Sequence, residues 1–194
     1  QKLLCFNCRN QTRRGFAAMS QQITRKDFTE FLEPGDDELI ATFGRKHDQS
    51  QKEVRQIKYE DFDLGEAVVS ILISRYRNPD VDPRQVGEIG KNLLEAGLAA
   101  YLAADRIIDG NKPDRVYLFN GRGSQQRAIL RACEKNRVEY HVIEEGCDLE
   151  HYAIFKNSTP HDISYMTKMM REAWEQGDKS ALADQAKSFF EKRS

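Results

Sequence analysis

The residues best suited to bind a ligand follow a short apolar segment in the second half of the chain. Residues 116–119 are apolar throughout and are followed by Asn120, Gly121, Arg122, Gly123, Ser124 and Gln125. Glycine amides, a guanidinium and the start of a helix are groups that bind phosphates and carboxylates. The turn is no P-loop, because no Gly-Lys-Ser/Thr follows. It also fails the dinucleotide fingerprint G-x-G-x-x-G, because Gln126 stands at the third glycine position. A tight strand–helix turn that binds no ligand, with the glycines relieving backbone strain, explains these residues equally well.

A second polar cluster, Glu144-Glu145-Gly146, follows the next apolar segment. A carboxylate at this place could act as a general base toward a hydroxyl group, which makes Glu144 and Glu145 catalytic candidates. Two solvated acids at a turn are the alternative. His161 is a third candidate for the base, although it follows Pro160 and could simply help to start a helix.

The cysteines give little support to a metal or redox centre. Cys5 and Cys8 form half of a zinc-binding pattern or a redox dithiol, and no second pair or close pair of histidines completes it. We therefore expect ordinary thiols, with no metal and no cofactor. Cys133 is expected on the buried side of a helix. Four cysteines in 194 residues favour a reduced, cytoplasmic setting over a secreted disulfide framework.

The polar clusters belong to one strand–turn–helix–strand unit over residues 115–146. In such a βαβ unit both clusters lie at the carboxyl ends of strands, where open α/β sheets bind their ligands. The continuous apolar run at residues 116–119 predicts a strand that is covered on both faces. Ser124 is the expected cap of the intervening helix.

The rest of the chain is mostly helical in pattern. Apolar spacing predicts a helix from residue 63 to 76, and Asp82-Pro83 begins a long helical region that runs to about Ile108. Later segments predict a short strand at residues 152–155, a helix after Thr159-Pro160-His161-Asp162 and a last helix beyond Gly177. Their apolar stripes are expected to face the core or a partner.

The first third of the chain has weaker patterns. A helix is expected within residues 1–22, a strand or a helix at residues 39–43, a polar loop at residues 47–53 and a strand at residues 54–59. The whole predicts an α/β fold: a Rossmann-like parallel sheet flanked by helices, helix-rich, with a long helical insertion. We expect residues 1–194 to form a single domain.

Composition excludes some classes of partner. The net charge is −1, so the chain lacks the basic footprint of a nucleic-acid-binding protein. Apolar stretches are far shorter than the roughly 20 residues that cross a bilayer. Nothing at the start is typical of a signal peptide.

Three motifs resemble a known family. They are DLGEAV at residues 63–68, VYLFNGRGSQQRAILRACEKNRVEYHVIEEG at 116–146 and YAIFKNSTPHD at 152–162. Together they resemble the N-terminal part of bacterial surface- and capsular-polysaccharide biosynthesis proteins, which are similar to GT-B glycosyltransferases. The Cys5 and Cys8 pair also matches, whereas Gly123 and Glu145 depart from the family pattern. The resemblance extends from residue 5 to about residue 175.

The resemblance implies a Rossmann-like lobe that binds the acceptor and faces a second lobe across a cleft. The implied reaction transfers sugar from a nucleotide-sugar to a hydroxyl of a carbohydrate acceptor. Glu144, Glu145 or His161 would be the base. The residues that would position the substrate are Asn120, Gly121, Arg122, Gly123, Ser124 and Gln125.

The length of the chain shapes a further expectation. It runs from Gln1 to Ser194, with no room for the second lobe, so we expect a longer protein and only weak binding without transfer by these residues alone. That longer protein could associate with a membrane surface or form a homo-oligomer. A stand-alone nucleotide- or anion-binding module without catalysis is the alternative function, and a purely structural interaction domain is a third.

Overall fold

The computed structural model describes Asn10, residues 14–15, residues 24–146 and residues 151–191. Cys5, Cys8 and Cys147 lie outside these described residues, as does most of the helix expected within residues 1–22. The expectations for these segments stay predictions.

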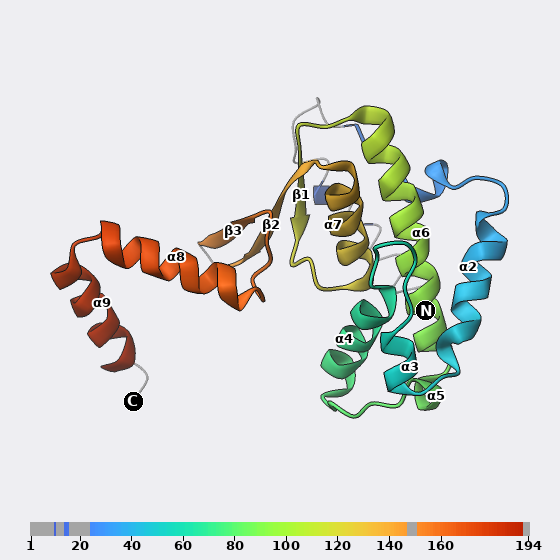
Figure 1. Ribbon diagram of the computed structural model, residues 1–194, viewed down its shortest axis with the longest axis horizontal. Helices are drawn as coiled ribbons and strands as arrows, with labels where there is room; N and C mark the ends of the chain where they lie inside the picture. Colours follow the sequence, from blue (N-terminus) through green and yellow to red (C-terminus); the bar gives the residue numbers. More distant parts are fainter. Residues whose placement is uncertain (1–9, 11–13, 16–23, 147–150, 192–194) are drawn as a thin grey trace.

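A long central helix, α6 (Glu88–Asn111), organises the helical body. Helices α2 (Asp36–Gly44), α4 (Leu64–Tyr76) and α7 (Ser124–Asn136) pack around it (Figure 1). Leu94, Leu98 and Tyr101 of α6 are almost completely buried. The Tyr101 ring stacks on Phe62 with its centroid 5.2 Å away. Burial of these large apolar side chains, each worth roughly 1.5–3 kcal/mol, holds the body together.

Helices occupy the region after residue 82 in which the sequence predicts a long helical segment, with one break. Asp82 caps α5 (Pro83–Val86), because its carboxylate accepts a hydrogen bond from the Arg84 amide at 3.0 Å. Gly87 follows with a φ of 51°, a backbone conformation that residues with a side chain rarely adopt. This glycine separates α5 from α6. The long region predicted from residue 82 onward is therefore two helices.

The prediction of a strand at residues 54–59 is wrong. Val54 lies inside α3 (Gln51–Arg55), and Ser50 and Glu53 form a reciprocal capping box at its start. This local hydrogen bonding outweighs the strand preference of the segment. The polar loop expected at residues 47–53 is shorter than predicted. It is limited to residues 48–50, because the 3₁₀ helix η2 (Arg45–His47) ends at His47 and α3 begins at Gln51. Another short 3₁₀ helix is η1 (Phe28–Phe31).

Three strands form one mixed sheet in the order β1 (Arg115–Phe119), β2 (Glu139–Glu145) and β3 (Tyr152–Lys156). β1 and β2 are parallel and are joined through α7, as the βαβ pattern predicts. β3 runs antiparallel to β2, which corrects the expectation of a parallel sheet. Its connection to β2 is too short for the crossover that parallel pairing requires. The chain is thus a helix-rich α/β fold with a small mixed sheet.

Helices among the described residues cover one face of this sheet. Leu118, Val142 and Phe155 are buried on the side of α7, whereas Tyr117 and Phe119 are 54% and 53% exposed. The expectation that this strand is covered on both faces is therefore wrong. We call the uncovered side the open sheet face. Its aromatic, aliphatic and histidine side chains are Tyr117, Phe119, His141, Ile143, Tyr152 and Ile154. The strand registers place the charged residues Arg115, Glu139, Glu145 and Lys156 on the same side, at its margins.

Helices α8 (Ile163–Gln176) and α9 (Lys179–Glu191) extend from the body as an arm (Figure 1). Both begin where the sequence predicts, and neither contains a buried residue. Ile163 and Met170 of α8 are 80% and 64% exposed. The apolar stripe of α8 is therefore not part of this chain's described core.

Candidate functional site

The turn after β1 is built tightly against the end of β2. Asn120 and Gly121 have φ angles of 61° and 74°, and the Asn120 amide donates to the Ile143 carbonyl at 2.9 Å. A Cβ on Gly121 would lie 3.3 Å from Cγ2 of Thr159 and 3.5 Å from Leu130. Glycine thus serves both the left-handed backbone and the close approach of the loop that carries Thr159.

Glu144 lies beside this turn, where a hydrogen bond already occupies its carboxylate. Its carboxylate accepts a hydrogen bond from the side-chain amide of Asn120. The Asn120 side-chain oxygen in turn accepts from the Arg122 amide at 3.2 Å. Asn120 and Glu144 therefore connect the ends of β1 and β2.

The loop of residues 157–162 faces the turn and is also rigidly held. Asn157 exchanges hydrogen bonds with the Tyr140 backbone at 2.8 and 2.9 Å. The buried Ser158 hydroxyl donates to Asp162 at 3.1 Å, and Asp162 accepts from the Tyr165 amide at 3.0 Å to cap α8. That amide and the Ser158 hydroxyl hold the pKa of Asp162 below its usual value. His161 is presented from this fixed loop.

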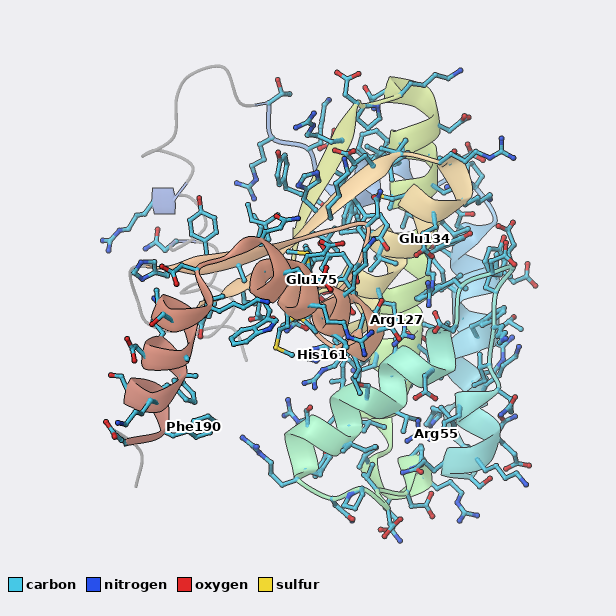
Figure 2. The ribbon with its side chains drawn as sticks, turned by 60° about the vertical axis from the view of Figure 1, so that its left-hand side comes forward. Arg55, Arg127, Glu134, His161, Glu175 and Phe190 are labelled. Carbon is cyan, nitrogen blue, oxygen red and sulfur yellow. The ribbon has the colours of Figure 1, made fainter. Side chains whose placement is uncertain are left out.

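A cavity of about 420 Å³ lies between the turn, the loop, α4 and α7. Figure 2 shows His161 and Arg127 on the side where α8 begins, between α7 and α4. Hydroxyl and amide groups on its walls come from Ser70, Tyr140, Asn157, Ser158 and Thr159. The charged residues that line the cavity are Arg122, Arg127, Arg131, Glu66, Glu134 and Asp162.

The arginines of α7 are largely neutralised. Asp63 accepts hydrogen bonds from Arg127 Nη2 at 2.5 Å and from Arg131 Nε at 2.9 Å. Burial raises the pKa of Asp63, but the hydrogen bonds and charges of the two arginines outweigh it and keep that pKa below its usual value. Arg131 also donates to Glu134 at 2.6 Å. The cavity therefore has little net charge despite its arginines.

The structure gathers only some of the predicted site residues at this cavity. Gly121, Arg122 and His161 line it, and Arg122 Nη2 also donates to the Ser74 hydroxyl at 2.7 Å. Asn120 and Gly123 line a shallower groove beside it, together with Arg122. Glu145 is exposed at the end of β2, outside the walls of the cavity.

Two further residues of the turn are placed differently. Ser124 is 2% exposed and lies beside Gly97 of α6, and Gly123 rather than Ser124 is the N-cap of α7. The expectation of a serine cap is therefore wrong. Gln125 is exposed and is not part of the cavity wall.

Sequence reasoning missed Asp63 and both arginines of α7. Arg127 and Arg131 are one helical turn apart, a spacing that places them on the same face. This spacing could have predicted from the sequence that the two arginines lie side by side. The pairing with Asp63 could not be predicted in this way, because Asp63 lies 64 positions before Arg127.

Other kinds of site find little support in the part of the chain that the structure describes. No group of three or more histidine, cysteine or acidic residues there could hold a metal ion. No described helix is long and apolar enough to cross a membrane. Burial raises the pKa of the Cys133 thiol to about 12, as expected for a structural rather than a reactive cysteine.

Comparisons with known proteins do not extend this description. No family model matches the chain, and no curated protein or solved structure is significantly similar to it.

Proposed function

We propose that this chain is the acceptor-side lobe of a GT-B-like glycosyltransferase and that the cavity binds a carbohydrate acceptor. The supporting observation is a polar cavity of nearly balanced charge at the carboxyl end of β1. A neutral, polyhydroxylated ligand needs many donors and acceptors and little net charge, as these walls provide. Its position also agrees with the place where open α/β sheets bind ligands.

His161 is the proposed general base. It would accept the proton of the acceptor hydroxyl while that oxygen attacks the anomeric carbon of a nucleotide-sugar and the nucleoside diphosphate departs. Asn157 and Thr159, on the same loop, would orient the acceptor. Glu144 suits the role less well, because its carboxylate already accepts a hydrogen bond from Asn120.

A nucleotide- or anion-binding module is the second candidate. The position of Arg122 favours this module. The guanidinium groups of Arg127 and Arg131 are paired with Asp63, whereas that of Arg122 contacts the neutral Ser74 hydroxyl. An anion could draw this flexible side chain into the cavity. The two candidates differ in the charge of the ligand.

Calorimetric titration of the chain with neutral oligosaccharides and with nucleoside diphosphates separates them. We expect oligosaccharide binding that His161→Ala weakens by about fivefold, the equivalent of one hydrogen bond near 1 kcal/mol. Glu145→Gln is the matched control, because this carboxylate lies outside the cavity walls. Nucleotide binding that Arg122→Ala abolishes, with no response to any sugar, would contradict the proposal and support the module.

A further inference from the structure

The arm formed by α8 and α9 needs a partner surface. These helices have 14 and 13 residues and no buried residue. Isolated helices of this length are marginal in water, and most helical stability comes from packing of an apolar face. The apolar stripe of α8 consists of Ile163, Met166, Met169, Met170 and Trp174, all of them exposed.

The open sheet face also carries exposed apolar side chains, those of Tyr117, Phe119, Tyr152 and Ile154. Phe119, Ile143 and Ile154 form one continuous apolar row across all three strands. Beside this row the face becomes polar, with His141 bonded to Glu139 at 2.8 Å and Lys156 paired with the same carboxylate. An apolar patch with a polar rim is typical of a surface that binds another protein surface.

The arm does not reach the open sheet face of its own chain. Tyr165 of α8 packs against Phe155, whose side chain is buried on the α7 side of the sheet, with ring centroids 6.1 Å apart. The loop before α8 lies on that same side, because Asn157, Ser158 and Thr159 line the cavity together with residues of α7. The edge strand β3 therefore separates α8 from the open sheet face.

We propose that two copies of this chain form a symmetric dimer in which α8 of each copy packs on the open sheet face of the other. The dimensions agree, because α8 is roughly 21 Å long and β2 roughly 23 Å. Each of the five stripe residues exposes on the order of 100 Å² of surface to water, and so does each of the four exposed residues of the sheet face, Tyr117, Phe119, Tyr152 and Ile154. A reciprocal contact would then remove roughly 1,800 Å², within the range of stable interfaces.

Two substitutions test this arrangement on the full chain. Ile154→Lys places a charge on the sheet face, and Met170→Glu places one on the helix stripe; both side chains are exposed, so neither substitution disturbs the core. Circular dichroism checks the fold. Analytical ultracentrifugation should give twice 22.4 kDa for the wild-type chain and 22.4 kDa for each variant.

Mixing the two variants identifies which surfaces meet. In a mixed pair, the intact helix of I154K can pack on the intact sheet face of M170E, and the two new charges attract in the other contact. The mixture should therefore recover dimers that neither variant forms alone. A dimer in which sheet packs on sheet, or helix on helix, would gain no intact contact on mixing. If the mixture does not recover dimers, the proposed packing of α8 on the partner's sheet is therefore wrong.

Lys168→Gln is the control, since Lys168 lies nearly opposite Met170 around the helix. It should stay dimeric like the wild type. A wild-type chain that remains at 22.4 kDa at high micromolar concentration would also overturn the proposal. Some other segment or protein would then cover these faces.

Discussion

Asp63 determines the electrostatic character of the cavity at the scale of single residues. Its carboxylate joins two arginines from a different part of the chain and leaves the walls nearly neutral. Without that carboxylate Arg127 would lose the ion pair with Asp63, and Arg131 would keep only its pair with Glu134. Loss of this one carboxylate would therefore make the cavity more positive and more favourable to anions.

Asp63→Asn should lower the free energy of unfolding by about 2 kcal/mol at pH 7, less than the loss of one partner in a fully buried pair costs. The folded state lowers the pKa of Asp63, so this stabilisation is fully present well above its ordinary value of 3.8 and is lost as pH falls through the folded pKa. Urea unfolding should therefore show a constant difference between wild type and variant from about pH 5 to 7 and a smaller one below about pH 4.

Asp109→Asn is the matched control for this substitution, because Asp109 is exposed on α6. It should change stability by less than about 0.5 kcal/mol. An equally small effect of Asp63→Asn at pH 7 would show that the pairing with Arg127 and Arg131 contributes nothing.

Close contacts between helices position the cavity at the scale of elements. Gly65 of α4 allows the Val54 carbonyl to approach, and Gly97 of α6 allows both α4 and α7 to pack closely. A Cβ on Gly97 would lie 2.6 Å from Cδ1 of Leu64 and 3.1 Å from Cβ of Ser124. The cavity wall between α4 and α7 therefore depends on a residue that does not line it.

Gly97→Ala should destabilise the chain by about 1–3 kcal/mol through overpacking, despite the better helix propensity of alanine. Gly110→Ala in the same helix is the matched comparison, since a Cβ there meets nothing within 4 Å. It should stabilise by about 0.5–1 kcal/mol. Thermal unfolding of both variants gives opposite signs, and equal signs would contradict the packing that we describe.

At the scale of the whole molecule, the described residues form a well-packed body and an arm without buried residues. Residues of α4, α6 and α7 supply most of the buried core, whereas α8 and α9 supply no buried residue. Regions with few buried contacts open more easily than the core.

Hydrogen exchange should separate these parts. In the Met170→Glu variant, amides of α8 and α9 should exchange orders of magnitude faster than those of α6, because opening the arm exposes little apolar surface. In the wild-type chain, protection of α8 should rise with protein concentration if two copies cover it. Equal protection of α6 and α8 in the variant, at every concentration, would contradict this difference.

Local patterns predicted most elements of this chain. Apolar spacing identified α4 and α6, and the caps Asp82 and Asp162 marked the starts of α5 and α8 correctly. These signals are local, since a cap bonds within three residues and a helical stripe repeats every turn. The same reasoning failed at Val54, where the Ser50 and Glu53 capping box was overlooked.

By itself, the sequence determined the βαβ unit and its turn at Gly121, because the crossover, the glycines and the strand periodicity all lie within about thirty residues. Only the tertiary structure decided the direction of β3, the uncovered face of the sheet and the pairing of Asp63 with Arg127 and Arg131. Those features depend on which segments meet in space. Residues 64 positions or more apart leave no periodic trace of that meeting in the chain.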